Sequence, residues 1–294
     1  MLNALIVVNS KNKKTHFYNH LADVCQALSR KNYSIKISFT KKPNDISNIL
    51  ADVEQIDLIV VAGGDGTMNE VVNALSKTEH KVKIMYFPTG TVNDFGTSLK
   101  IPHNFKKQLQ LLNKHTTMMV DSGKVNEYYF NYICAFGAFT RASYTTPHWE
   151  KNKYGKLAYY RHLIDEIPAL SKSYELDIDV DGEKINGNFS YALIINSTSV
   201  AGFRHFLKND SMNDGYFNLL LVTKANAKVF KKAIKYLIKG MSDNIDDDHY
   251  ILRKFKKLTI NTDDKISWTI DGEKGPVGSI EVEVIKHNLE IICP

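Results

Sequence analysis

The chain has 294 residues, of which 43% are apolar and 24% are charged. This length and composition suit one or two folded domains and exclude a disordered chain. The net charge of +6 is too small by itself to indicate a nucleic-acid-binding protein, and three scattered cysteines exclude a secreted disulfide scaffold. No run of about 18 apolar residues occurs, so we expect no transmembrane helix.

The first third of the chain alternates short apolar runs with helical patterns. We expect strands at 4–8, 34–39, 57–62 and 82–87, and helices at 17–31, 43–54 and 68–76. Such alternation favours a parallel sheet that is covered by helices on both faces.

After Asp121 the pattern changes to β-rich runs that are separated by turn signals such as Asp181-Gly182. We expect strands at 128–136, 174–180, 189–195, 216–222, 258–260, 265–270 and 279–285. These runs predict a second, mainly antiparallel domain. No Pro-rich or Ser-rich linker divides the chain, so we expect domains at 1–122 and 123–294 that pack closely around a cleft.

A glycine-rich segment, Gly63-Gly64-Asp65-Gly66-Thr67, follows an expected strand and precedes a helix. Glycines let the backbone approach a phosphate, and a helix start offers unpaired N–H groups. The segment lacks the Gly-Lys-Ser/Thr ending of a Walker A loop and is not GxGxxG. A carboxylate beside phosphates is costly without a cation, so Asp65 indicates Mg²⁺ with a nucleotide. The alternative is a tight turn in which Asp65 caps the helix.

A second signal, Pro88-Thr89-Gly90-Thr91-Val92-Asn93-Asp94-Phe95, follows the apolar run at 84–87. Loops that follow two strands of one parallel sheet both lie at its carboxyl edge, where such sheets bind ligands. The two loops could therefore share one site, although this stretch could also be an ordinary turn and helix cap.

Together, these two segments resemble the catalytic-domain signature of the diacylglycerol kinase and sphingosine kinase superfamily, and most of all its soluble bacterial lipid kinases. Further matches are Val120-Asp121-Ser122-Gly123, Phe130-Asn131 with Gly137, Asp214-Gly215-Tyr216 and Ile270-Asp271-Gly272-Glu273. The resemblance implies an α/β nucleotide-binding domain with a parallel sheet, a mainly antiparallel β-sandwich lipid-substrate domain, and ATP in the cleft between them.

The resemblance also implies which residues contact ATP, together with the loop at 9–13. These are Asn9, Thr40, Gly64, Asp65, Gly66, Thr67, Asn69, Glu70 and Thr91. A metal site in the second domain would use Asp214 together with Ser211 and Tyr216, the latter two through backbone oxygens.

The late acidic motif suggests a proton acceptor. If 268–273 continues as a strand, Asp271 and Glu273 point to the same face, because side chains alternate. Two close carboxylates raise each other's proton affinity, which suits a general base for a lipid hydroxyl. The resemblance implies that one of them is the proton acceptor, and both remain open. The alternative is an Asp-Gly hairpin turn.

These observations predict an ATP-dependent, Mg²⁺-requiring lipid kinase that phosphorylates a hydroxyl of diacylglycerol or a related lipid. Asp65 and either Asp94 or Asp121 would organise Mg²⁺, and Asp271 or Glu273 would accept the hydroxyl proton. Two alternatives remain open: a kinase for a soluble substrate such as NAD, and a catalytically silent, nucleotide-binding regulator at the membrane.

The segment 224–239 contains six lysines and no acidic residue. As a helix it would place apolar residues on one face and lysines on the opposite one. The lysine face is either solvated or docks on an anionic membrane. We expect a cytoplasmic protein that associates peripherally with the inner face of the membrane, with ATP and a membrane lipid as partners and no nucleic acid. A homodimer is left open.

Overall fold

The computed structural model describes residues 1–10, 16–114, 116–137, 172–200, 203–204, 207, 211–223, 229, 232, 236, 239–241, 245 and 248–294. The chain forms two compact units, one of Met1–Val120 with His287–Pro294 and one of Asp121–Lys286. The sequence placed the last residues in the second domain. They belong to the first unit because the end of the last strand pairs there.

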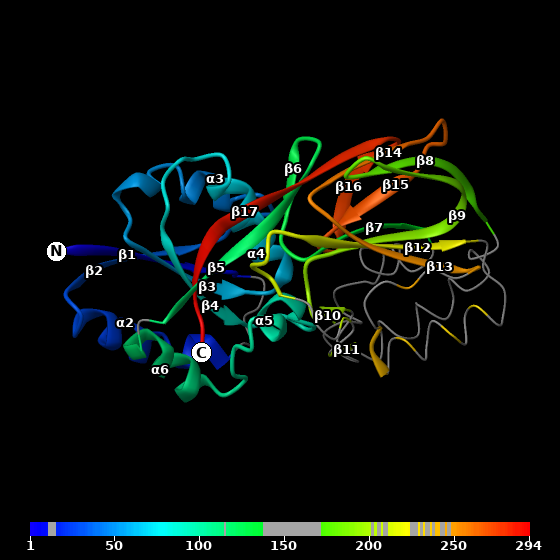
Figure 1. The fold of residues 1–294 in the computed structure, drawn as a ribbon. Coiled ribbons are helices and arrows are strands. Elements are labelled where there is room, and N and C mark those ends of the chain that lie inside the picture. Colours follow the sequence, from blue (N-terminus) through cyan, green and yellow to red (C-terminus); the bar gives the residue numbers. More distant parts are fainter. Residues whose placement is uncertain are drawn as a thin grey trace. The chain divides into compact units, whose positions relative to one another are not determined.

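The first unit contains a parallel sheet, as the alternating pattern predicted (Figure 1). Its strands are β1 (Leu2–Val8), β2 (Tyr33–Phe39), β3 (Leu58–Gly63) and β4 (Lys83–Pro88), in the order β4-β3-β1-β2. The end of β17 (Ile280–Ile292) adds a parallel partner to β4. All six residues of β3 are buried, as expected for a central strand that is covered on both faces.

The helices of the first unit are α1 (His16–Asn19), α2 (Leu21–Ser29), α3 (Ile46–Ile49), α4 (Asp65–Leu75), α5 (Asp94–Ser98) and α6 (Phe105–Lys114), with a short 3-10 helix η1 at Val53–Gln55. The helix expected at 17–31 is divided at His20. The prediction at 43–54 is wrong over most of its length, because Asn44 adopts φ 61° and the four residues of α3 are weak helix formers. The helix expected at 68–76 begins three residues earlier, at Asp65.

The second unit is built from antiparallel strands, which confirms the predicted change of class. Its strands are β6 (Tyr128–Phe130), β7 (Ile133–Gly137), β8 (Tyr174–Val180), β9 (Glu183–Ile195), β12 (Phe217–Thr223), β13 (Tyr250–Phe255), β14 (Lys257–Asn261), β15 (Ser267–Ile270) and β16 (Glu273–Val277), with a short pair β10 (Ser199–Val200) and β11 (Phe203–Arg204). The strands β5 (Thr117–Val125) and β17 contribute residues to both units.

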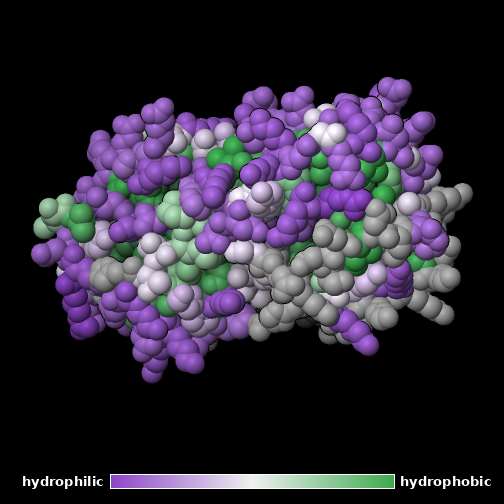
Figure 2. Space-filling view, viewed as in Figure 1, coloured by the Kyte–Doolittle hydropathy of each residue, from purple (hydrophilic) through white to green (hydrophobic). Residues whose placement is uncertain are grey.

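Large aromatic side chains fill the core of the second unit. Trp268 is fully buried, and its ring meets that of Phe136 edge to face at a centroid distance of 4.9 Å. Phe217 and Phe130 make a similar contact at 5.4 Å. Hydrophilic side chains cover most of the described surface on the side shown in Figure 2. The apolar residues of the predicted strands therefore form the core that holds the second unit together.

Candidate active site

The glycine-rich segment forms the turn between β3 and α4. Gly63 ends the strand, Gly64 has extended backbone, and Asp65 is the first helical residue. The N-cap residue is Gly64, which has no side chain to cap this helix start. The helix is 11 residues long, and its dipole adds positive charge at the same end. The turn therefore has the features of an anion-binding site.

The direction of the sheet order changes between β1 and β3. The chain leaves β1 toward β2 on one side and leaves β3 toward β4 on the other. Open α/β sheets bind ligands outside the carboxyl ends of the strands at this point. Asn9 follows β1, and its side-chain amide donates a hydrogen bond of 2.8 Å to the hydroxyl of Thr67. The structure thus brings two predicted ATP-contacting residues together at the switch point.

Thr40 lies at the same edge, directly after β2. Its N–H donates to the carbonyl of Val8 at 3.0 Å, and its own carbonyl accepts from the hydroxyl of Ser10. Thr40 is 8% exposed. Its backbone therefore ties the ends of β1 and β2 together, and its side chain has little free surface.

The second signal forms a loop that packs against the glycine-rich turn. Asn93 adopts a left-handed conformation with φ 56°, and its amide both donates to and accepts from the backbone of Gly90. A Cβ on Gly90 would lie 2.6 Å from the Cα of Gly64. Two glycines are therefore needed for the two backbones to approach this closely.

The carboxylate of Asp65 joins the two loops. It accepts hydrogen bonds from the N–H groups of Asp94 at 3.1 Å and Phe95 at 3.2 Å. These are the first residues of α5, so Asp65 caps a different helix from the one that the alternative prediction named. Asp94 itself is 3% exposed. One role of Asp65 is thus structural, since it fixes the second loop against the glycine turn.

Tyr86 lies on β4 beneath this region, and the sequence analysis did not identify it as a site residue. The side chain is fully buried, and its hydroxyl has no hydrogen-bond partner in the described protein. Burial, and to a smaller degree the negative charge of Asp65, raise the pKa of Tyr86 well above its ordinary value. The phenol therefore stays neutral near Asp65 at physiological pH.

The remaining residues expected at ATP lie in or beside the same turn. Gly66 is in the first turn of α4, and Asn69 and Glu70 follow on the same helix, where both are half-buried. Thr91 is exposed in the second loop. Residues 11–13 of the expected loop at 9–13 lie outside the described residues.

The late acidic motif is a hairpin turn, which was the alternative given for it, and the strand does not continue through Asp271. β15 ends at Ile270 and β16 begins at Glu273, opposite Ile270. Asp271 and Gly272 have φ angles of 49° and 86°, the left-handed conformations of a two-residue type I′ turn. The alternation that would place Asp271 and Glu273 on one face is therefore absent.

The two acidic residues of this turn have different surroundings. Asp271 is 4% exposed, and its carboxylate accepts three backbone N–H bonds, from Asn131 at 2.7 Å and from Tyr132 and Ile133 at 3.1 Å. Glu273 is exposed on the next strand. Asp271 thus anchors the segment 131–133, whereas the carboxylate of Glu273 is open to solvent.

Two buried asparagines lie close to this anchor and were not identified as site residues. Neither the nitrogen nor the oxygen of the Asn131 side-chain amide has a hydrogen-bond partner among the described residues, although Asn131 is fully buried. The amide of Asn196 donates to the carbonyls of Asp121 and Asn131, while its oxygen has no partner. The Phe130-Asn131 match was the one signal for this pair. Such unsatisfied amides suit a bound water or a polar ligand group.

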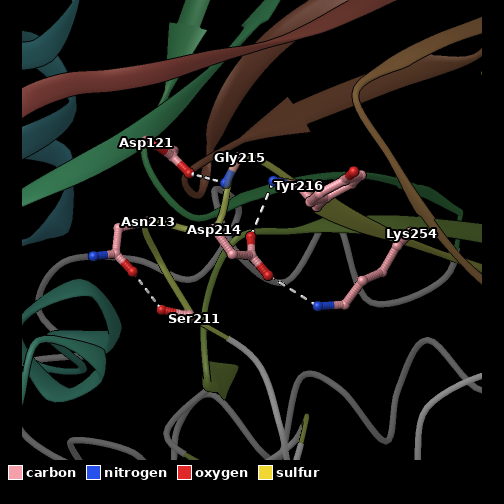
Figure 3. Close-up of polar contacts among 7 residues, drawn as sticks. All are labelled: Asp121, Ser211, Asn213, Asp214, Gly215, Tyr216 and Lys254. Carbon is pink, nitrogen blue, oxygen red and sulfur yellow. Dashed lines mark hydrogen bonds and ion pairs between the residues drawn. The ribbon is translucent and has the colours of Figure 1, made fainter.

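The residues expected to hold a second-unit metal lie in one loop, where Asp214 is paired with a lysine (Figure 3). Asp214 Oδ2 lies 3.0 Å from Lys254 Nζ, and its Oδ1 accepts the N–H of Tyr216. Ser211 donates its hydroxyl to the amide oxygen of Asn213. Among the described residues, no three His, Cys, Asp or Glu side chains lie close enough to hold a metal ion.

Part of the lysine-rich segment falls within the described residues. Val229, Lys232, Tyr236 and Lys239 are helical, and Val229 is buried. Lys232 Nζ lies over the rings of Tyr236 and Tyr250, at 5.7 and 5.3 Å from their centroids. This lysine therefore packs on aromatic rings, while the other predicted face residues, Lys228, Lys231 and Lys235, lie outside the described residues. No helix in the described part of the chain is sufficiently long and apolar to span a membrane.

Comparison with known proteins gives one consistent result. Residues 3–125 match the family model of the diacylglycerol kinase catalytic domain. The chain is 31% identical over 297 residues to a diacylglycerol kinase of Bacillus subtilis (strain 168), which covers 100% of this chain and 97% of that protein. It is 30% identical over 293 residues to a diacylglycerol kinase of Staphylococcus carnosus (strain TM300), with coverage of 99% and 95%.

Solved structures show the same fold. A crystal structure described as a diacylglycerol kinase from Bacillus anthracis str. Sterne covers 99% of this chain and 97% of its own, with a TM-score of 0.78 at 21% identity. A second structure from that organism has the same coverage, a TM-score of 0.85 and 24% identity.

Proposed function

Because the chain belongs to the diacylglycerol kinase family, we propose that it is an ATP-dependent lipid kinase. The reaction would transfer the γ-phosphate of ATP to the hydroxyl of diacylglycerol or a related lipid, giving phosphatidic acid or an analogue. The first unit would bind the nucleotide, and the second would supply the proton acceptor for the lipid hydroxyl.

The observation that carries this proposal is the glycine turn at the switch point of the parallel sheet. Three features lie there: the start of α4 with a glycine at its N-cap, the close approach of Gly64 to Gly90, and the contact of Asn9 with Thr67. Backbone N–H groups at a helix start bind phosphate oxygens without needing a positively charged side chain. This arrangement supports ATP as the phosphate donor, with its phosphates at the turn.

Mg²⁺ would be held at this turn by Asp65 together with Asp94. Carboxylate oxygens are the ligands that this ion prefers, and each oxygen of Asp65 keeps a lone pair besides the one that accepts a backbone N–H. When bound, the ion supplies positive charge that neutralises the phosphates. Asp65 would also hold the second loop in place during binding.

We assign the proton acceptor to Glu273 and a positioning role to Asp271. Both oxygens of the buried Asp271 carboxylate accept backbone N–H bonds, so this side chain holds the segment 131–133 in place. Glu273 follows it by two residues and is exposed, so a substrate hydroxyl can reach it. The turn that Asp271 fixes would then determine where Glu273 lies.

The test is transfer of radiolabelled phosphate from ATP to lipids in mixed micelles. The panel contains diacylglycerols, monoacylglycerols, sphingoid bases and phosphatidylglycerol. We expect labelling of diacylglycerol or a related lipid that requires Mg²⁺. A wild-type enzyme that labels none of these lipids would refute the proposal, and formation of NADP from NAD and ATP would support the soluble-substrate alternative.

Peripheral membrane binding through the segment 224–239 is a separate part of the proposal. Each lysine close to an anionic surface contributes about 1 kcal/mol to binding. Flotation with anionic vesicles should show binding that weakens with salt and with charge reversal of Lys231, Lys232 and Lys235. Charge reversal of three exposed lysines elsewhere, Lys36, Lys77 and Lys265, is the matched control. Equal losses in both triple variants would contradict a specific role of this segment.

A further inference from the structure

Strand pairing places a lysine beside the loop that resembles a metal site. The loop at 211–216 leads directly into β12, and β12 pairs with β13 so that Asn218 lies opposite Lys254. Figure 3 shows the Asp214 side chain pointing toward Lys254, at the 3.0 Å separation of an ion pair. The side chains are 29% and 37% exposed, so the pair is partly shielded from water. Lys254 thus holds its positive charge where a cation would contact Asp214.

Three other side-chain oxygen atoms around this loop, on Asp214, Asp121 and Asn213, accept hydrogen bonds from protein donors. Asp214 Oδ1 accepts the N–H of Tyr216 at 3.0 Å, and Asp121 Oδ2 accepts the N–H of Gly215 at 2.7 Å. The hydroxyl of Ser211 is directed to Asn213. Mg²⁺ and Ca²⁺ require about six oxygen ligands, and at this loop each of these contacts competes with a cation while the charge of Asp214 is already balanced by Lys254.

Two further lysines increase the positive charge at the same loop. Lys256 Nζ lies 4.8 Å from the ring centroid of Tyr216. A Cβ on Gly215 would lie 3.3 Å from Cδ of Lys286, so that side chain runs along the loop backbone. Both side chains add positive charge in the neighbourhood of the loop, which opposes the approach of another cation. A divalent ion that bound Asp214 Oδ2 would have to displace the ammonium group of Lys254.

We propose that the ammonium group of Lys254 replaces a divalent cation at the loop 211–216, so that the second unit binds no metal ion there. The loop is then held by an internal ion pair whose charge does not depend on metal supply. The proposal concerns a site that is separate from the Mg²⁺ that accompanies ATP, and it does not rest on the proposed kinase activity.

The first test measures thermal unfolding of the full chain in EDTA, Mg²⁺ or Ca²⁺ at equal ionic strength, without ATP or lipid. We expect the same unfolding temperature for the wild type in all three. Lys254→Met keeps most of the aliphatic length and removes the charge, so Asp214 becomes available to metal. In that variant we expect Mg²⁺ or Ca²⁺ to raise the unfolding temperature by about 2–4 °C over EDTA.

The matched control is Lys256→Met, which removes a neighbouring lysine that does not pair with Asp214. It should show no metal response. If Lys254→Met also shows none, Lys254 does not exclude metal and the proposal is wrong. The double variant Lys254→Met, Asp214→Asn should lose the response, and a response that persists there would also contradict the proposal.

A second measurement does not depend on the folding of the Lys254 variant. Binding of Mn²⁺ is followed by electron paramagnetic resonance for the wild type and for Asp214→Asn, again without ATP. We expect equal numbers of bound ions, because the wild-type loop holds none. A bound ion that is present in the wild type and lost in Asp214→Asn would overturn the proposal.

Discussion

Both units fix an acidic residue with backbone N–H groups, but over very different distances in sequence. Asp65 accepts two such bonds from residues 29 and 30 positions away, at the start of α5. Asp271 accepts three from residues 138 to 140 positions away. Asp65 is half-buried, whereas Asp271 is almost fully buried.

This difference separates two kinds of carboxylate. Asp65 links adjacent loops at the edge of one parallel sheet and keeps contact with solvent, so it can also face a ligand. Asp271 closes a long-range contact inside the second unit, where unpaired N–H groups are expensive. We therefore expect substitutions at Asp271 to affect folding first, and substitutions at Glu273 or Asp65 to affect the reaction or the nucleotide first.

The largest expected effect is on kcat in Glu273→Gln, and it distinguishes the role of Glu273 from that of Asp271. Glu273→Gln removes a proton acceptor at an exposed position, so we expect kcat to fall by about 10²- to 10⁴-fold. The unfolding free energy should change by less than about 0.5 kcal/mol, because the side chain is exposed. The lipid-labelling assay and urea unfolding give the two values. Full activity in this variant would remove Glu273 from the mechanism.

Asp271→Ala, unlike Glu273→Gln, should lower the unfolding free energy strongly. It leaves three N–H groups without their acceptor, two of them from residues that are buried, so we expect a loss of about 3 kcal/mol in unfolding free energy. Asp271→Asn is the control, because Asn tolerates the left-handed backbone and keeps one acceptor oxygen. Asp271→Asn should lose clearly less unfolding free energy than Asp271→Ala. Equal stability of all three proteins in urea would show that the anchor is unimportant.

Gly90→Ala tests how closely the two loops of the first unit must approach. The new methyl group would lie 2.6 Å from the Cα of Gly64, which is backbone and cannot move independently. We expect a loss of about 2 kcal/mol in unfolding free energy and weaker ATP binding. Gly187→Ala is the matched control, since its nearest neighbours, in Phe189, lie at an ordinary 3.5 Å. An unaffected Kd for ATP in Gly90→Ala would argue against a shared site.

Asp65→Ala should have a smaller effect on stability than Asp271→Ala. It removes two hydrogen bonds at a half-buried position, where water can replace the lost acceptor, so we expect about 1 kcal/mol. Asp65→Ala should also weaken the dependence of ATP affinity on Mg²⁺, which titration calorimetry with and without Mg²⁺ measures. A stability loss equal to that of Asp271→Ala would remove the distinction between the two carboxylates.

The parallel sheet and the glycine turn could be predicted because their signals are contiguous. The apolar runs of β1, β3 and β4 and the turn Gly63–Thr67 each lie within a few residues, and local rules describe such segments well. The start of α4 was placed three residues late, because the glycines of the turn hid the first helical residues. At Asp271 the sequence left two alternatives open, and the structure has the hairpin turn, for which Asp-Gly is a strong local signal, rather than a continuous strand.

The contacts that determine the roles we assign to Asp271 and Asp214 join residues that are far apart in the sequence. Asp271 accepts its hydrogen bonds from the segment 131–133. The pairing of Asp214 with Lys254 depends on the register of β13, a strand that the sequence analysis did not predict. Neither can be obtained from local periodicity. Sequence therefore named these acidic residues as candidates, but could not show which N–H and ammonium groups they meet.

Tyr86→Phe gives the smallest effect at neutral pH and the clearest pH dependence. The hydroxyl has no protein partner, so its removal should change the unfolding free energy by less than about 0.5 kcal/mol at pH 7. The pKa of the buried phenol is well above the ordinary value of 10.0 that it regains on unfolding. Below pH 10.0 the Tyr86 phenol is protonated in both the folded and the unfolded chain. The stability of the wild type and of Tyr86→Phe should therefore depend on pH in the same way there.

Above that pH the unfolded wild-type chain releases the Tyr86 proton while the folded chain retains it. The wild type should therefore lose about 1.4 kcal/mol per pH unit relative to Tyr86→Phe, until the folded-state pKa is reached. Urea unfolding of both proteins across the alkaline range measures this difference directly. Parallel pH curves would mean that the phenol ionises equally in both states, and that the neutral side chain beneath Asp65 does not exist in solution.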